Sequence, residues 1–261
     1  MREIDEKYFL KQRSFLLSCS NRDELSDEDY QILIENGRTY RGKQQWPQFR
    51  SFKPGFYPWF LDGEEIRLFT LVIEQVIHVS RIAKNDSNVI KKLEGWELVR
   101  EYDEKSDEWT NAQYVEQESL KAVNDDVPLL VNELELQELR KSLKKSTITF
   151  EFDCDYILSP IQDHPNERPY YPSLLLSVER INGLIVFNDM LKITNKNEEL
   201  QKFFLEFIRR IGSIPELIWV KEEIAHCIKP VTKKLNINVN VVQSLPFLEE
   251  ARKEMEMMSS H

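Results

Sequence analysis

The second half of the chain carries the pattern that most restricts its fold: alternating strand-like segments followed by segments of helical period. Residues 147–158 alternate, with Phe150 and Phe152 on the apolar side. Segments 172–180 and 183–191 follow as further strands, joined at Asn182-Gly183, which is a strong β-hairpin signal. Apolar side chains then recur at helical spacing in 197–212, 222–235 and 244–258, with short apolar strands at 216–220 and 237–242 between these helices.

This order, βββαβαβα, predicts a mixed sheet with helices packed against it. Strand-helix-strand units return parallel strands through right-handed crossovers, whereas the hairpin-linked strands are antiparallel. We therefore predict an α/β domain over residues 146–261. A linker with a short helix is predicted to precede it at 121–145.

Residues 1–120 are predicted to form a separate α+β domain. The stretch WPQFRSFKPGFYPWFLDGEE (46–65) is rich in aromatic residues and interrupted by prolines, so it is extended. A long helix follows from Gly63 to about Ala83, with Asp62 and Glu65 in capping-box positions. Because this helix is apolar most of the way round, we expect it to be buried on several sides. Segments 95–103 and 108–117 are predicted to form a β-hairpin.

The simplest cover for this helix is the aromatic segment that leads into it, which we define as residues 46–60. Large aromatic side chains bury much apolar surface, and burial of such surface is the main driving force of folding. We therefore interpret the segment as a structural strap, with Trp59, Phe60 and Phe56 largely buried against the helix. The alternative is an exposed platform for a ligand.

Charge and sequence limits narrow the class of protein. The net charge is −10, with 45 acidic and 35 basic residues spread over both halves, which makes nucleic acid an unlikely partner. The sequence shows neither a signal peptide nor an apolar run long enough for a bilayer, so no membrane association and a cytoplasmic location are expected.

Two resemblances add to this interpretation. The order βββαβαβα over residues 146–261 resembles the ribonuclease H-like fold of integrases and transposases. Separately, segments 46–65, 167–186 and 212–251 resemble a bacterial family of two linked domains of unknown function. In that family a further sheet-containing segment precedes the equivalent of residues 12–25, which implies that this chain lacks the start of the first domain.

The ribonuclease H-like resemblance implies where catalytic carboxylates would lie: on the first strand, after the fourth strand and on the last helix. Asp153 and Asp155 share the polar face of the first strand with Glu151, and Glu222 or Glu223 follows the fourth strand. Glu249 or Glu250 lies on the last helix. The alternative function is therefore a divalent-metal-dependent nuclease or phosphoryl-transfer enzyme, with Mg²⁺ or Mn²⁺ held by Asp153, Asp155 and Glu222.

We favour a different function, that of a cytoplasmic bacterial protein with a degenerate ribonuclease H-like domain, acting without catalysis and without a cofactor. Acids on the outer face of a strand or at a helix start are ordinary solvated residues. The expected partner is an unknown protein or small ligand. Candidate interaction residues are the basic and aromatic side chains of two loops: Arg50, Lys53, Arg168, Tyr170 and Tyr171.

Overall fold

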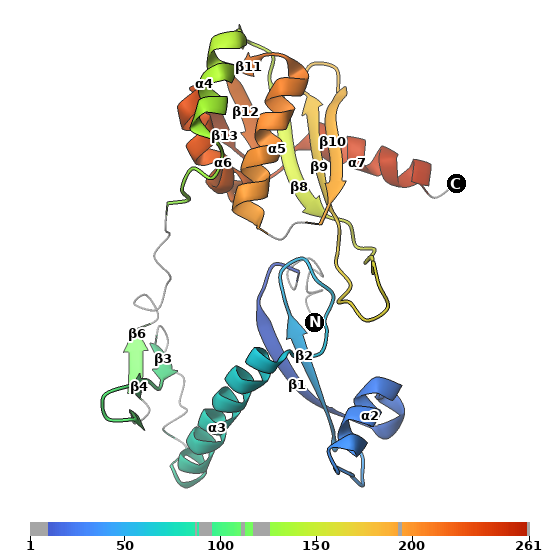
Figure 1. Ribbon diagram of the computed structural model, residues 1–261, viewed down its shortest axis with the longest axis vertical. Coiled ribbons are helices and arrows are strands. Elements are labelled where there is room, and N and C mark those ends of the chain that lie inside the picture. The colour runs from blue at the N-terminus through green and yellow to red at the C-terminus, as the bar shows by residue number, and fades with distance from the viewer. Residues whose placement is uncertain are drawn as a thin grey trace. The chain divides into compact units, whose positions relative to one another are not determined.

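The computed structural model of the 261-residue chain describes residues 10–86, 88, 96–110, 113–116, 126–192 and 195–259 (Figure 1). It divides into two compact units. The first, the sheet unit, comprises Met1–Arg13, Phe52–Pro58 and Asp126–His261, and the second, the helix unit, comprises Ser14–Ser51 and Trp59–Asp125. The segment Phe52–Pro58 thus belongs to the sheet unit, although it lies within the aromatic segment. Of the predicted linker 121–145, residues 121–125 lie outside the described part.

The sheet unit is built on a mixed five-stranded sheet in the order β10-β9-β8-β12-β13. β8 (Phe150–Tyr156), β9 (Ser173–Glu179) and β10 (Ile185–Leu191) are antiparallel neighbours, and Gly183 in the β9–β10 turn has a φ of +71°. β12 (Leu217–Val220) runs parallel to both β8 and β13 (Asn238–Val241). This confirms a mixed α/β architecture, and the elements follow the predicted order.

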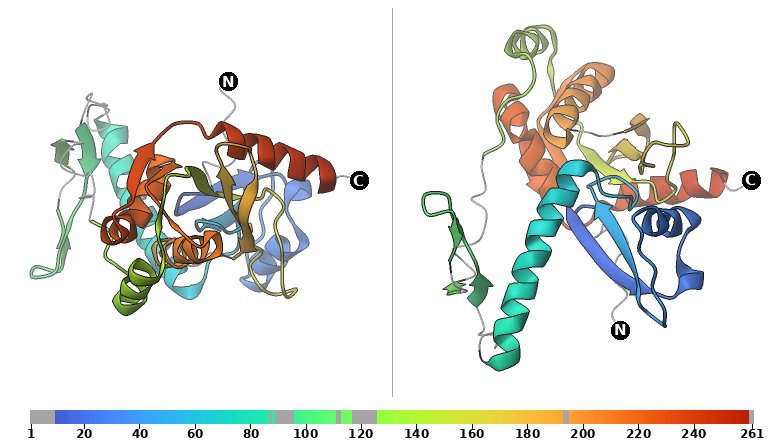
Figure 2. Two further views of the ribbon diagram at one scale, coloured as in Figure 1. Left: turned by 90° about the horizontal axis from the view of Figure 1, so that it is seen from above. Right: turned by 60° about the horizontal axis from the view of Figure 1, so that its bottom comes forward.

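Helices cover both faces of this sheet, as Figure 2 (left) shows. α4 (Glu133–Ser142), α5 (Lys196–Ile211) and α6 (Glu222–Leu235) contribute to the larger core with one face of the sheet. Phe152, Phe204 and Phe207 are fully buried there, with Phe152 5.4 and 5.5 Å from the other two ring centroids. α7 (Pro246–Ser259) packs on the opposite face in a second, smaller core. A short parallel pair, β7 (Lys145–Ser146) with β11 (Ile214–Pro215), lies outside the main sheet.

The helix unit begins with β1 (Ser14–Ser20), a 3-10 turn η1 (Arg22–Glu24) and α2 (Asp27–Glu35), which is capped by Ser26. β1 pairs with β2 (Trp46–Phe52) in a two-stranded sheet. α3 (Gly63–Asn85) follows, and the side chain of Asp62 accepts hydrogen bonds from the backbone N–H groups of Glu64 and Glu65. The predicted capping box and helix start are therefore confirmed.

The predicted hairpin is present in the described part of 95–117. β3 (Trp96–Val99) pairs with β6 (Gln113–Glu116), and β4 (Tyr102–Asp103) pairs with β5 (Glu108–Trp109). Gly95, residues 111–112 and Gln117 of the prediction lie outside the described residues. None of the described helices combines the length and apolar character that crossing a bilayer requires.

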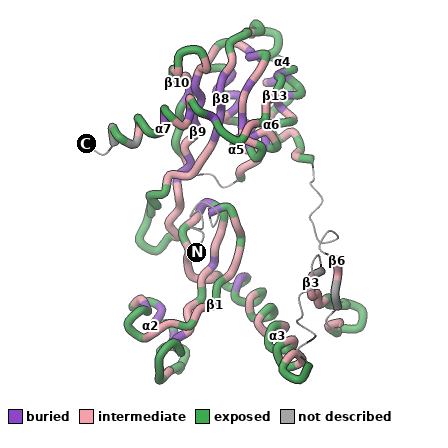
Figure 3. The backbone as a smooth tube through the Cα atoms, turned by 180° about the vertical axis from the view of Figure 1, so that it is seen from behind, coloured by how far each residue is buried: buried purple, intermediate pink, exposed green. Residues whose placement is uncertain are grey.

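The predicted burial of α3 is wrong. Within α3 the one buried residue described is Glu65, whereas Leu68 and Val76 expose 50% and 59% of their surface. Figure 3 shows α3 as exposed or intermediate along most of its length. Trp59 and Phe60 are only half-buried, and Phe56 pairs with Tyr170 of the sheet unit through an isolated β-bridge. The aromatic segment therefore does not act as a continuous strap, because Phe52–Pro58 belongs to the sheet unit whereas α3 belongs to the helix unit.

Candidate functional site

The polar face of β8 is covered by α7 and is not solvated as the sequence suggested. Glu151 is fully buried, and its Oε1 accepts a hydrogen bond of 3.2 Å from Nε of Arg180. Its Oε2 accepts a second one, of 2.9 Å, from the backbone N–H of Leu248 in the first turn of α7. A carboxylate is favoured there because the first N–H groups of a helix lack partners and carry partial positive charge. Glu151 therefore fixes the start of α7 to the sheet.

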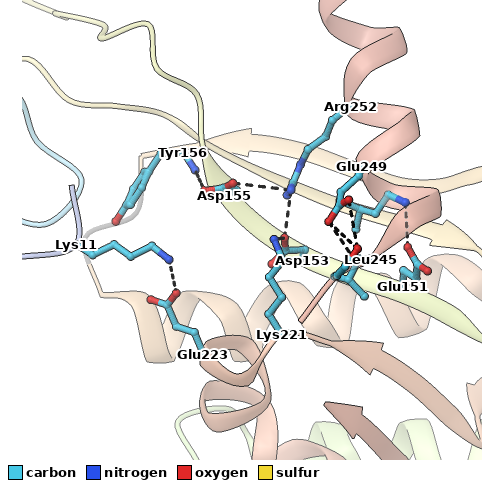
Figure 4. A network of polar contacts seen from close by, with 12 residues as sticks. Lys11, Glu151, Asp153, Asp155, Tyr156, Lys221, Glu223, Leu245, Glu249 and Arg252 are labelled. Carbon is cyan, nitrogen blue, oxygen red and sulfur yellow. Dashed lines mark hydrogen bonds and ion pairs between the residues drawn. The ribbon is translucent and has the colours of Figure 1, made fainter. Parts of the chain in front are cut away.

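Asp153, two residues further on the same face, lies between two cations (Figure 4). Its side chain is 3% exposed, and the same atom, Oδ2, lies 3.2 Å from Nζ of Lys221 and 3.2 Å from Nη1 of Arg252. Arg252 also lies 3.8 Å from Oδ2 of Asp155, so one guanidinium serves both aspartates. The two cations come from the residue after β12 and from α7, and together they neutralise the buried charge of Asp153.

The remaining predicted acids do not join this cluster in a metal site. Glu222 is exposed at the first position of α6, and Glu249 accepts hydrogen bonds from Ser244 and Leu245 at the start of its own helix. In the described part of the chain, no group of three or more His, Cys, Asp and Glu side chains could hold a metal ion. The prediction that the acids on the strand face are ordinary solvated residues is wrong for Glu151 and Asp153, which are buried and paired.

Glu223 forms a second charged cluster next to the start of α6. Lys11 donates to its Oε2 over 2.7 Å, and Lys196 of α5 donates to its Oε1. Burial acts to raise the pKa of the Glu223 carboxyl, but these two ammonium groups outweigh it, so the pKa lies below its usual range. Glu223 is thus held as a carboxylate by two lysines.

The thiol of Cys154, which lies between Asp153 and Asp155 in the sequence, is too buried and too weakly acidic to act as a nucleophile. Burial raises the pKa of the Cys154 thiol to about 12. The space between Cys154, Asp155 and Tyr156 measures only about 10 Å³, which is the size of one water molecule at most. Cys154 is therefore a packing residue on the α5 side of the sheet.

The predicted interaction residues of the sheet unit connect two of its own loops. Nε of Arg168 donates to the carbonyl of Tyr57 over 2.9 Å, and the N–H of Tyr171 donates to the carbonyl of Gly55 over 2.8 Å. The Tyr170 ring lies 4.4 Å from the ammonium of Lys192. Lys53 belongs to the same Phe52–Pro58 segment, where its carbonyl accepts from the N–H of Phe56. These contacts give the four residues a structural role, and their role toward a partner stays a prediction.

The fifth residue, Arg50, belongs to the helix unit and forms a two-point ion pair with Asp29 of α2. Nη1 lies 2.7 Å from Oδ1, and Nη2 lies 2.5 Å from Oδ2. The guanidinium also lies 5.0 Å from the centroid of the Phe60 ring. Burial acts to raise the pKa of Asp29, but hydrogen bonds from Arg50 and Ser26 outweigh it and hold the pKa below its usual range.

Asp29→Asn is expected to destabilise the helix unit by about 1.5–3 kcal/mol at pH 7, the range for a hydrogen bond to a charged group. Because the pKa of Asp29 is lowered on folding, its stabilisation is present above the unfolded value of about 4 and is lost as the pH falls through the folded value. The difference between wild type and variant, measured by urea unfolding, should shrink below about pH 4. Asp27→Asn, at an exposed position of the same helix turn, is the control and should show neither effect.

An apolar pocket of about 290 Å³ adjoins this ion pair, because Asp29 is one of its lining residues. Rings of the aromatic segment form part of its wall. Phe49 and Phe60 line it together with Ile66, Phe69 and Ile73 of α3. The Phe49 and Phe69 rings are nearly perpendicular, with centroids 6.3 Å apart. Phe49 and Phe60 of the aromatic segment thus line a pocket, and they neither fill a closed core nor form a flat exposed surface.

Two family models match the chain. Residues 135–256 match the family described as domain of unknown function DUF6930, and residues 1–100 match the domain of unknown function DUF7309. The predicted resemblance to domains of unknown function in both halves is therefore confirmed. No curated protein matches the chain.

Among solved structures, one match is the crystal structure of the Mos1 strand transfer complex. The match has a TM-score of 0.31 and 13% sequence identity, and it covers 55% of this chain and 56% of that chain. The matched region thus spans little more than half of the solved chain. A likeness at this TM-score supports no conclusion about function.

Sequence reasoning missed the basic partners of the buried acids. Lys221 follows β12 directly, and Arg252 lies on α7, one turn after Glu249. The acids at these two places, Glu222 and Glu249, were considered as ligands, but the neighbouring cations were not. A signal was available for two of these cations, because Arg180 and Lys221 directly follow the apolar strands β9 and β12, where a charge needs a partner. Arg252 lies among the charged residues 249–254, which gave no such signal.

Proposed function

We propose that residues 146–261 form a degenerate ribonuclease H-like domain and that the protein acts by binding a partner rather than by catalysis. The strand order β10-β9-β8-β12-β13, with β9 antiparallel to its neighbours, supports this architecture. The observation that carries the functional part is the pairing of Asp153 with Lys221 and Arg252.

The chemistry of metal-dependent phosphate cleavage explains why this pairing matters. Such an enzyme needs several carboxylates around a divalent cation that positions and activates water. The ribonuclease H-like resemblance puts these acids on the first strand, after the fourth strand and on the last helix, and this chain has acids near all three places. The groups that face Asp153 from the last two places, however, are the bases Lys221 and Arg252. A divalent cation at Asp153 would have to displace both positive groups and would meet their repulsion.

The partner would be a protein or small ligand, and the acidic net charge argues against nucleic acid. The alternative, a nuclease or phosphoryl-transfer enzyme using Mg²⁺ or Mn²⁺, would require Asp153, Asp155 and Glu222 to converge after Lys221 and Arg252 have moved away. The contacts of the described residues favour the non-catalytic proposal over this one.

The test combines cation-dependent stability with a cleavage assay. Millimolar Mg²⁺ or Mn²⁺ is expected to change the melting temperature of the wild type by less than about 1 °C, because a cation that does not bind the folded state cannot stabilise it. Single- and double-stranded nucleic acids are expected to stay intact in the same buffers.

The matched pair of variants is Asp153→Asn and Asp163→Asn, the second at an exposed aspartate 3.8 Å from Lys192. Asp153→Asn should lower the melting temperature equally with and without Mn²⁺, because it leaves Lys221 and Arg252 without their shared carboxylate. A Mn²⁺-dependent stabilisation that disappears in Asp153→Asn but persists in Asp163→Asn, together with cleavage, would refute the proposal.

A further inference from the structure

One side of α3 carries a row of exposed apolar residues that the rest of the described helix unit leaves uncovered. Leu68, Leu71, Val72 and Val76 expose between 40% and 59% of their surface. Soluble proteins seldom expose contiguous apolar patches beyond a few hundred Å², and a larger patch marks a binding site. This row is continuous with a pocket on the same side of the helix.

The pocket lies between α3 and the β3–β6 hairpin and has a volume of about 490 Å³. The helix contributes the exposed row together with Val79, and the hairpin contributes Leu98, Arg100 and Trp109. This volume falls within the range of about 300–1,000 Å³ that is usual for small-molecule sites. We call it the α3–hairpin pocket.

Arg100 is the single charged residue among the described residues that line this pocket, where the other polar ones are Gln75 and Ser80. Its Nε and Nη1 atoms are buried, and no described group accepts a hydrogen bond from either of them. A guanidinium cannot lose its proton in a protein, so it needs an acceptor in order to be buried without a large cost. A guanidinium presents its N–H groups in a rigid fork, and Nε with Nη2 on one edge matches the two oxygens of a carboxylate.

We propose that the α3–hairpin pocket binds a small molecule that has one hydrocarbon chain as its apolar body and a carboxylate as its head. The head would pair with the guanidinium of Arg100, whose side chain would turn so that the edge formed by Nε and Nη2 faces the pocket, and the apolar body would cover Leu68, Val72 and Val76. This accounts for the exposed row and for the unpartnered guanidinium with one ligand. The site lies in the helix unit, so the outcome of the nuclease test on residues 146–261 does not affect it.

The experiment measures binding of dodecanoate and of dodecan-1-ol to the full chain by titration calorimetry, below their aggregation concentrations. Dodecanoate should bind more tightly than the alcohol, which lacks the charged head. Arg100→Leu should weaken dodecanoate binding by on the order of tenfold to a hundredfold, the equivalent of one charge-assisted hydrogen-bonding interaction. The same variant should change binding of the alcohol by less than about threefold, because the apolar wall remains.

Two further variants separate this pocket from the smaller one near Phe60. Val76→Trp should fill the α3–hairpin pocket and abolish binding of both probes, whereas Ile73→Trp should fill the pocket beside Phe49 and leave binding unchanged. Circular dichroism checks that each variant keeps its helices. Loss of binding with Ile73→Trp but not with Val76→Trp would overturn the assignment, as would equal binding of both probes that Arg100→Leu leaves unaffected.

Lipid vesicles distinguish a soluble ligand from a membrane surface, which could offer the same chemistry. The proposal expects no flotation of the protein with vesicles of phosphatidylglycerol, since a single chain in the pocket does not require a bilayer. Flotation that depends on Arg100, without measurable affinity for monomeric dodecanoate, would replace the proposed ligand by a lipid surface.

Discussion

Glutamine in place of Glu151 is expected to lower the free energy of unfolding by about 3 kcal/mol, the low end of the range for breaking a buried ion pair. Glutamine keeps the size of the side chain and its acceptor for the N–H of Leu248. It removes the charge that faces Nε of Arg180 at 3.2 Å. The Arg180 side chain is 23% exposed, and its guanidinium carbon lies 3.4 Å from the centroid of the Trp219 ring, which limits the loss.

This prediction is checked by urea unfolding of the variant at neutral pH. Glu198→Gln is the matched control, because it breaks an exposed pair with Lys202 on α5 and should leave stability nearly unchanged. If Glu151→Gln were as harmless as this control, the charge of Glu151 would have no role in holding Arg180 and the start of α7 to the sheet. A fall in stability together with greater proteolysis of α7 would support that role directly.

Period-two alternation predicted much of the sheet unit. The separation of Phe150 and Phe152 from Glu151 and Asp153 follows from strand geometry alone, because successive side chains point to opposite faces. The hairpin at Gly183 and the end of α5 at Gly212 were also predictable, since both glycines have a positive φ, which other residues seldom adopt. These features depend on residues close together in the sequence.

Alternation could not show what covers the acidic face of β8. The partners of Glu151 and Asp153 extend from Arg180, the residue after β9, to Arg252 of α7, and they lie between 29 and 99 residues away in the sequence. A polar strand face is solvated in a two-layer fold and buried in a three-layer one, and the period of the strand is the same in both. In this chain α7 covers the face, and cations from distant parts of the sequence pair with its acids. The local sequence of a strand does not show which distant residues will contact it.

The exposed row on α3 shows the opposite error. The apolar character of α3 predicted that the helix is buried. The aromatic segment was expected to cover it, but residues 52–58 of that segment belong to the sheet unit, whereas Ser51 and Trp59 belong to the helix unit. These two residues pair through backbone hydrogen bonds of 2.8 and 3.1 Å, which close the intervening residues into a loop. The prolines predicted an extended backbone for this segment, but they did not predict that Trp59 would pair with Ser51.

Replacing both Lys221 and Arg252 by glutamate is expected to give the sheet unit a divalent-cation site, which the described residues of the wild type do not form. Both cations lie 3.2 Å from Oδ2 of Asp153, so the two substitutions direct three carboxylates toward one point. Glutamate is shorter than lysine or arginine, which leaves room for an ion with oxygen distances of about 2.0–2.1 Å, as for Mg²⁺. Without a cation the acids repel one another, and the melting temperature should fall below that of the wild type.

Saturating Mn²⁺ should then raise the melting temperature of this double variant by about 5–10 °C, which corresponds to about 2–3 kcal/mol of binding linked to folding. The control is Lys229→Glu with Lys234→Glu, an equal change of charge at exposed positions of α6, where Mn²⁺ should have no such effect. Electron paramagnetic resonance of bound Mn²⁺ provides a readout that does not depend on stability. If the folded double variant bound no Mn²⁺, the geometry of the backbone would exclude the metal, and the positive charges of Lys221 and Arg252 would not be what keeps the described residues of the wild type from forming a metal site.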